Sequence, residues 1–140
     1  MKNNYQNILI INTGGGLGDA LQFVSLFDYI NTNINPKNLY YYSNDLENFW
    51  FENKIKEYAP SNLITIKNFP EHFGCEKKHK LISKDLIKKF NFEKFDLIID
   101  NQTKLKNSLI YREIPHDQYI SPCLNYLFSN PFFLMRKKNM

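Results

Sequence analysis

The first twenty residues carry the feature that most limits the possible folds: a short apolar run that ends in glycines and precedes a helical pattern. Residues 7–12 read Asn-Ile-Leu-Ile-Ile-Asn, and residues 14–19 read Gly-Gly-Gly-Leu-Gly-Asp. A continuous apolar run of this length is typical of a strand buried on both faces of a parallel sheet. From Ala20 to about Asn31, apolar residues recur at helical spacing. The pattern therefore predicts a strand, a glycine loop and a helix, in that order.

Apolar runs and periodic segments alternate along the rest of the chain with short connections. This alternation predicts an α/β fold over residues 1–121, a Rossmann-like doubly wound parallel sheet with helices on both faces. Residues 8–11 and 97–99 are expected to form adjacent or nearly adjacent central strands. The other expected strands and helices are strands at 39–42, 63–66 and 118–120, and helices from Ser43 or Asn44 to about Tyr58, from Ser83, and over 105–112.

The composition limits the classes of function. The 140 residues have a net charge of +4, but arginine occurs only as Arg112 and Arg136. Surfaces that grip nucleic acid usually rely on the planar guanidinium group, and the lysines are spread along the chain except in residues 77–80, so we expect no nucleic-acid partner. The N-terminus is polar and no stretch approaches the ~20 apolar residues that span a bilayer. These features predict a cytoplasmic protein.

The cysteines and histidines give little indication of a metal site or a disulfide. Cys75 and Cys123 are isolated thiols far apart in the sequence, which predicts no disulfide framework. His72, Cys75 and His79 share one segment, but their spacing matches no standard zinc pattern. We therefore expect neither a metal ion nor a cofactor.

The glycine loop differs from the usual nucleotide-binding fingerprints. The pattern G-x-G-x-x-G would need glycine at position 19, which is Asp19, and the Gly-Lys-Ser/Thr ending of the Walker A loop is absent. An aspartate at this point would repel a pyrophosphate. Because ligands of doubly wound sheets bind at the carboxyl edge, where this loop lies, the loop is expected to hold a ligand other than a dinucleotide.

Two motifs together resemble the opening half of glycosyltransferase family 9, the ADP-heptose:lipopolysaccharide heptosyltransferase type. The first is residues 8–19, with an apolar strand, a small-residue loop, Gly-Asp and an apolar helix. The second is residues 95–102, an apolar strand with an Asp-x-Gln end, followed by Lys104 and Lys106. With the order of the elements, the resemblance covers residue 7 to about residue 120.

The resemblance implies the N-terminal half of a GT-B fold, in which this domain holds the acceptor. The implied acceptor is a lipopolysaccharide core or another glycan, free or lipid-linked. A second domain would hold the nucleotide-sugar donor, which is ADP-heptose in most of the family. Asp19 would be the general base of an inverting transfer, and the helix N-terminus favours its ionised form. The alternative role of Asp19 is a helix N-cap, which aspartate fills very often; the second motif favours the general base, and the two roles can coexist.

The acceptor would be bound by residues of the two motifs. Lysines on the outer face of a short helix are also common without any ligand. Asp100 is expected to hold its loop together instead of binding the acceptor. The implied acceptor-binding residues are Gly15, Gly16, Gly18, Gln102, Lys104 and Lys106.

Residues 122–140 are interpreted as a segment leading toward a missing donor domain, so the chain alone is expected to lack transferase activity. The aromatic and basic residues 126–138 are also compatible with peripheral contact with the inner membrane face. The alternative function is a non-catalytic Rossmann module that binds a nucleotide or a sugar phosphate. A third reading is a helper protein that docks onto a separate donor domain.

Overall fold

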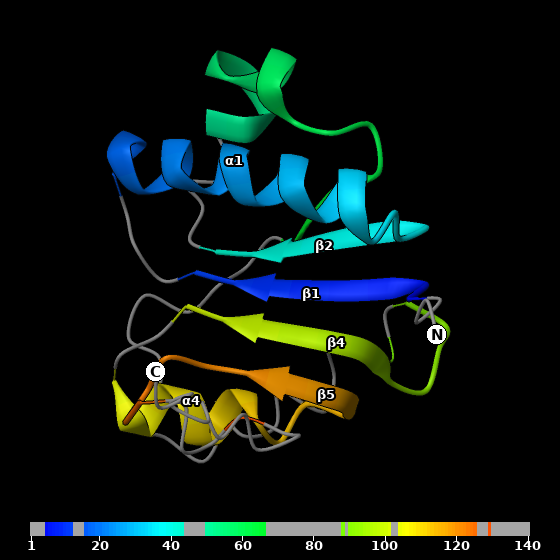
Figure 1. The fold of residues 1–140 in the computed structure, drawn as a ribbon, viewed down its shortest axis with the longest axis vertical. Coiled ribbons are helices and arrows are strands. Elements are labelled where there is room, and N and C mark those ends of the chain that lie inside the picture. The colour runs from blue at the N-terminus through cyan, green and yellow to red at the C-terminus, as the bar shows by residue number, and fades with distance from the viewer. Residues whose placement is uncertain are drawn as a thin grey trace, which may run out of the picture.

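The computed structural model describes residues 5–12, 16–43, 50–66, 88, 90–101, 104–125 and 129. Within these residues, five strands form one all-parallel sheet in the order β3-β2-β1-β4-β5, and the arrows of β1, β2, β4 and β5 point the same way in Figure 1. The sheet confirms the expected α/β class. The strands are β1 (Asn7–Ile11), β2 (Asn38–Tyr42), β3 (Leu63–Ile66), β4 (Phe95–Asp100) and β5 (His116–Ile120).

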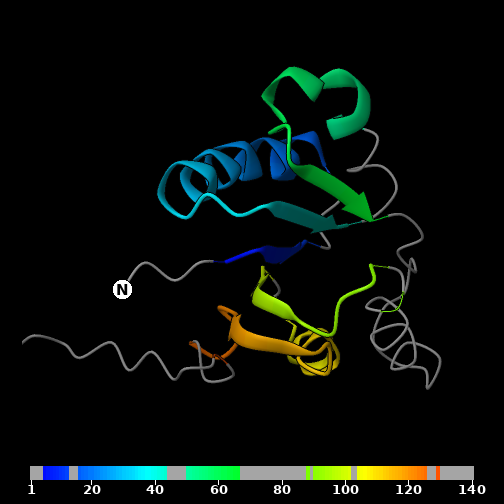
Figure 2. The ribbon, with the colours of Figure 1, turned by 90° about the vertical axis from the view of Figure 1, so that its right-hand side faces the viewer.

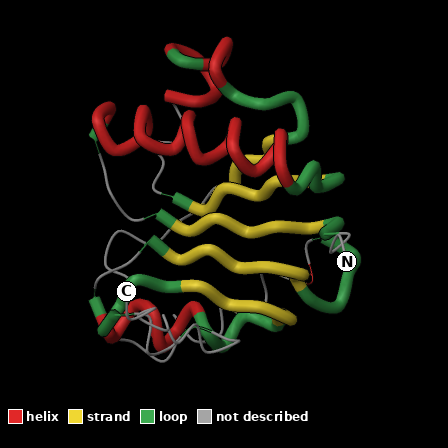
Figure 3. Tube along the Cα trace, viewed as in Figure 1, coloured by secondary structure: helices red, strands yellow, loops and turns green. Residues whose placement is uncertain are grey.

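Helices cover both faces of the sheet. Helix α1 (Leu17–Asn33) follows β1, and helix α4 (Leu105–Tyr111) follows β4. Figure 2 shows α1 on one side of the strands and α4 on the other, and Figure 3 shows the same layers by type of structure. The described helices thus give the expected layering, with helices above and below a parallel sheet.

Strand β1 lies at the centre of the sheet, between β2 and β4. It pairs in parallel with both, so that Ile8 lies beside Leu39 on one side and Leu97 on the other. The side chains of β1 alternate between the two faces: Ile8 and Ile10 pack in the α1 layer, whereas Leu9 and Ile11 pack in the α4 layer. All four are fully buried. Burial on both faces explains why this strand is a continuous apolar run, and the predicted pairing of residues 8–11 with 97–99 is confirmed.

Aromatic side chains fill much of the core on the α1 face. The ring of Phe27 packs edge-on against Tyr41 at a centroid distance of 5.4 Å, and Phe51 contacts both of these rings at 5.2 Å. Aromatic pairs in such tilted or edge-to-face arrangements stabilise beyond the area that they bury, by about 0.5–1.5 kcal/mol each. These contacts fix the segment that contains Phe51 to the rest of the domain.

The segment before β3 differs from the α-helix expected up to Tyr58. Its described part forms a π-helix, η1 (Trp50–Lys54), and a 3-10 turn, η2 (Lys56–Tyr58). The Ile55 N–H donates to the Trp50 carbonyl at 2.9 Å, which is the wider i to i+5 bond. Phe51 and Ile55 are both buried on the α1 side of the sheet. Apolar spacing marks a buried helical face but does not determine the pitch of the hydrogen bonds, which tertiary packing sets here.

Two other expectations lie outside the described residues: the helix from Ser83, and nearly all of the segment from residue 126 onward. Across the ranges that the structure describes, no helix combines the length and the apolarity needed to cross a bilayer.

Candidate functional site

The order of the strands reverses between β1 and β4. The chain leaves β1 toward β2 and β3, whereas it leaves β4 toward β5 on the other side of the sheet. The two strands end at the same level, because Ile11 lies beside Asp100 and the Asn101 N–H donates to the Ile11 carbonyl at 2.9 Å. In open α/β sheets, ligands bind outside the carboxyl ends of the strands at such a reversal. Both sequence motifs therefore lead to one edge of the sheet and to its switch point.

Asp19 lies in the first turn of α1 and is exposed to solvent. Its Oδ2 accepts a hydrogen bond from the Gly16 N–H at 3.3 Å, and Gly16 is the N-cap residue of the helix. The prediction that Asp19 is the N-cap is therefore wrong: Gly16 holds that position, and Asp19, at the third helical position, accepts from the Gly16 N–H as in a capping box. A carboxylate offers about four lone-pair sites, so this contact is compatible with accepting a further proton.

Neither of the two described glycines of the loop is needed for its backbone conformation or for lack of space. Gly16 has an extended conformation, with φ −106° and ψ 158°, which other residues adopt readily. A Cβ atom added to Gly16 would make ordinary contact with Asp19 at 3.6 Å, and one added to Gly18 would meet nothing within 4 Å. The space around Gly18 is thus open, on the same helical turn as Asp19. Gly15 lies outside the described residues.

The second motif places two lysines at the start of α4. Lys104 precedes the helix and Lys106 lies in its first turn, and both are exposed. The first turn holds no acidic residue. Arg112 is exposed at the opposite end of α4, so the structure does not bring it together with these lysines. Gln102 lies outside the described residues.

A row of buried polar residues, which the sequence motifs did not reveal, lines the carboxyl edge. Each of four strands ends in, or is followed directly by, a polar residue that is at most 3% exposed. A polar residue directly after an apolar run is visible in the sequence, but its burial is not. The residues are Asn12 after β1, Ser43 after β2, Asp100 at the end of β4 and Ser121 after β5.

Asp100 is the charged member of this row. The Tyr119 hydroxyl lies 2.5 Å from Asp100 Oδ2, to which it donates, and 3.0 Å from the Ser108 carbonyl of α4. Burial raises the pKa of the Tyr119 phenol, and the Asp100 charge raises it further, so Tyr119 remains a protonated donor. The contact joins the ends of β4, β5 and α4. Asp100 has a structural role there, as expected, and its fully buried side chain is not presented to a ligand.

Replacing Tyr119 by Phe is expected to destabilise the domain by about 1–3 kcal/mol or more, because the buried Asp100 carboxyl loses its phenol donor. Urea denaturation measures the change in the free energy of unfolding. Tyr29→Phe is the matched control, since Tyr29 is 61% exposed and its substitution should cost under about 0.5 kcal/mol. If Tyr119→Phe costs no more than the control, the hydrogen bond contributes nothing to the fold.

Among the described residues, no group of three or more His, Cys, Asp or Glu side chains is arranged to hold a metal ion. Comparison with protein-family models, with curated proteins and with solved structures finds no match. The function must therefore be inferred from the geometry of the switch point.

Proposed function

We propose that this chain is the acceptor-binding, Rossmann-like half of an inverting GT-B glycosyltransferase that resembles the heptosyltransferases of family 9. The observation that supports this most is that the two motifs follow the carboxyl ends of two neighbouring strands at one switch point. Asp19 lies in the first turn of the helix after β1, Lys104 and Lys106 lie at the start of the helix after β4, and β1 and β4 are neighbours.

Asp19 has the properties that a general base of this reaction needs. As the acceptor oxygen attacks the anomeric carbon of the donor, its proton would pass to the Asp19 carboxylate while the bond from that carbon to the diphosphate breaks. The carboxylate is exposed, lies on the turn that includes the open position Gly18, and is oriented by its hydrogen bond from Gly16. Such orientation at a rigid helix end is what positioned proton transfer requires.

Lys104 and Lys106 would bind an anionic group of the acceptor. Basic side chains are unfavourable at a helix N-terminus, where the helix dipole is already positive. Two lysines without an acidic residue in the same turn therefore make a local positive field. An acidic sugar or a phosphate on a lipopolysaccharide-type core oligosaccharide would be attracted by this field.

The alternative, a module that binds a nucleotide or a sugar phosphate, is less well supported by the first helix. A phosphate is usually held by unpaired N–H groups at a helix N-terminus. At α1, the Asp19 carboxylate already accepts from the Gly16 N–H and would repel a second anion. In enzymes of the proposed type, a separate donor domain holds the nucleotide sugar, so these 140 residues alone should bind acceptor without transferring sugar to it.

A binding comparison tests the proposal. We expect an inner-core lipopolysaccharide oligosaccharide, but not ADP, to bind the purified chain in isothermal titration. Replacing both Lys104 and Lys106 by Ala should weaken oligosaccharide binding by about fivefold or more, at roughly 1 kcal/mol for an exposed charge contact. The matched control is Lys37→Ala, an exposed lysine beyond the other end of α1. Tight binding of ADP without binding of the oligosaccharide would instead support the nucleotide module.

A further inference from the structure

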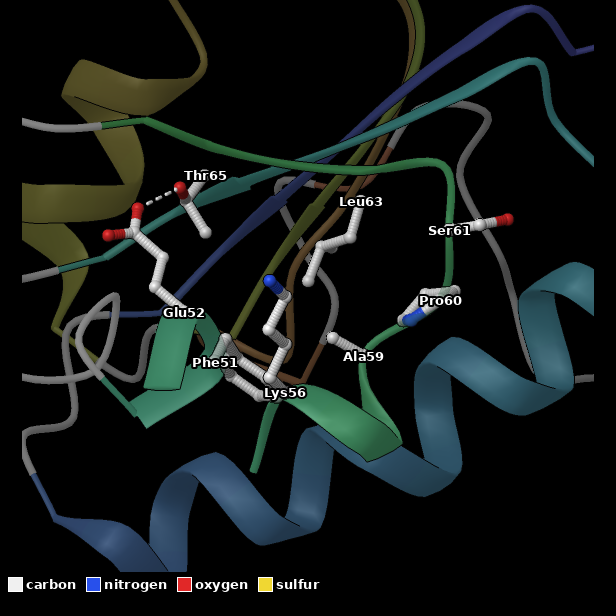
Figure 4. Close-up of a pocket in the computed structure, with 8 residues that line it drawn as sticks. All are labelled: Phe51, Glu52, Lys56, Ala59, Pro60, Ser61, Leu63 and Thr65. Atoms are coloured by element: carbon white, nitrogen blue, oxygen red, sulfur yellow. Dashed lines mark hydrogen bonds between the residues drawn. The ribbon is translucent and has the colours of Figure 1, made fainter. Parts of the chain in front are cut away.

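A hollow lies beside the edge strand β3, away from the switch point. It is bounded by the η1 and η2 turns on one side and by β3 on the other (Figure 4). Its volume of about 420 Å³ is within the range of small-molecule sites. The lining residues are Phe51, Glu52, Lys56, Ala59, Pro60, Ser61, Leu63 and Thr65.

One part of the hollow is apolar and fixed in place. Phe51 is only 2% exposed, and its ring is held by contacts with Phe27 and Tyr41. Leu63 packs against the same core cluster from β3. Because this wall is anchored in the core, an apolar ligand group could pack on it without a costly reordering of side chains.

The polar part of the hollow holds two opposite charges. Thr65 Oγ1 donates to Glu52 Oε1 at 2.7 Å, which orients the carboxylate. Lys56 extends into the space between Glu52 and Leu63 in Figure 4. Among the described residues, no carboxylate forms an ion pair with Lys56. Glu52 and Lys56 thus face one hollow and do not neutralise each other there.

We propose that this hollow binds a small zwitterion with an apolar body, of the size and chemistry of an apolar α-amino acid. The ligand carboxylate would pair with the Lys56 ammonium, and the ligand ammonium with the Glu52 carboxylate. The apolar side chain would pack on Leu63 and Ala59, which line the hollow and are less buried than Phe51. The proposal does not depend on the function proposed for the switch point.

Titration of the whole chain with L-leucine and two analogues tests the proposal. 4-Methylpentanoate lacks the ammonium group, and 3-methylbutylamine lacks the carboxylate. Leucine should bind, and each analogue should bind about tenfold more weakly or worse, because each loses one charge-assisted contact. Absence of leucine binding at millimolar concentration overturns the proposal, and so does binding of 4-methylpentanoate as tight as that of leucine.

Two substitutions test which charged side chain binds which charged group of leucine. Lys56→Met should abolish the preference for leucine over 3-methylbutylamine. Glu52→Gln should abolish the preference over 4-methylpentanoate, while its amide oxygen can still accept from Thr65. Lys54→Met is the matched control, because Lys54 is an exposed lysine of η1 that does not line the hollow. Leucine binding that is unchanged in both Lys56→Met and Glu52→Gln would place the ligand elsewhere and refute the site.

Discussion

Replacing Asp19 by Asn should lower glycosyl transfer by about 10²–10⁴-fold when this chain is joined to the donor domain of a family 9 enzyme. The amide cannot take the proton of the acceptor hydroxyl, so the base is lost. The same amide retains an oxygen that can accept from the Gly16 N–H, a contact of 3.3 Å. The free energy of unfolding should therefore change by no more than about 1 kcal/mol. Steady-state transfer from ADP-heptose and a thermal midpoint, measured on the same preparation, give both quantities.

Asp19→Ala, compared with Asp19→Asn, separates the general-base role of Asp19 from its role in stabilising the helix start. It removes the carboxylate and the contact with Gly16 together, so it should lose the same rate and also some stability, by about 0.5–1.5 kcal/mol. If Asp19→Asn turns over near the normal rate, Asp19 serves as a cap alone. A fusion of the unaltered chain that shows no transfer at all would count against the family resemblance itself.

The central strands could be predicted because their burial is uniform. Residues 8–11 of β1 face two covered layers, so each of them must be apolar, and the run stands out against its glycine boundary. The same reasoning identified β4, whose Leu97 and Ile98 face opposite layers. Local periodicity also identified α1, with Ala20, Phe23 and Phe27 on its buried side. In each case, the residues that face the core repeat at a period that the element itself imposes.

The features that were not predicted depend on partners far apart in the sequence. The π-helix of η1 is set by the packing of Phe51 against Phe27, 24 positions earlier along the chain. The burial of Asp100 depends on Tyr119 and on the α4 layer, which no local pattern around Asp100 encodes. Apolar runs thus predict where strands lie but not which polar side chains the completed sheet will enclose.

The sequence predicted where the candidate site lies, but not which contacts its side chains make. Because carboxyl ends of parallel neighbours meet at one edge, the Gly-Asp motif and the lysines after β4 could be expected there from the order of the elements alone. Two details followed only from the exact bounds of the helices. Asp19 accepts a hydrogen bond from Gly16 at the third helical position, and Arg112 lies at the far end of α4. The roles of Asp19 and of the lysines stay predictions until transfer and binding are measured.

Three of the four buried tyrosines that the structure describes on the α4 side of the sheet lead to a prediction about alkaline pH. Tyr42, Tyr111 and Tyr119 are each at most 2% exposed. Burial raises the pKa of all three phenols above the ordinary value of 10.0, and the charge of Asp100 raises those of Tyr111 and Tyr119 further. In the folded chain, these tyrosines therefore remain protonated at a pH at which they ionise in the unfolded chain.

The stability should consequently fall as the pH rises above about 10. Below that pH, each tyrosine is protonated in both states and contributes no pH dependence. Above it, the unfolded state binds fewer protons than the folded state, which costs about 1.4 kcal/mol per pH unit for each tyrosine and about 4 kcal/mol per pH unit for the three. Urea denaturation between pH 8 and pH 11 would give this slope, and the tyrosinate absorbance of the three buried phenols should appear together with unfolding.

Both tyrosines and lysines contribute to the pH dependence of the free energy of unfolding in this range. Substitution of single tyrosines isolates the tyrosine contribution. The pKa of Lys94, for example, is raised by its hydrogen bond to Asp117, so its contact is also lost at high pH. Tyr42→Phe removes one buried phenol and leaves every lysine, so it should reduce the tyrosine slope by about one third. Tyr58→Phe should leave the slope unchanged, since Tyr58 is 55% exposed. Equal slopes for Tyr42→Phe and Tyr58→Phe would mean that the buried phenols do not drive alkaline unfolding.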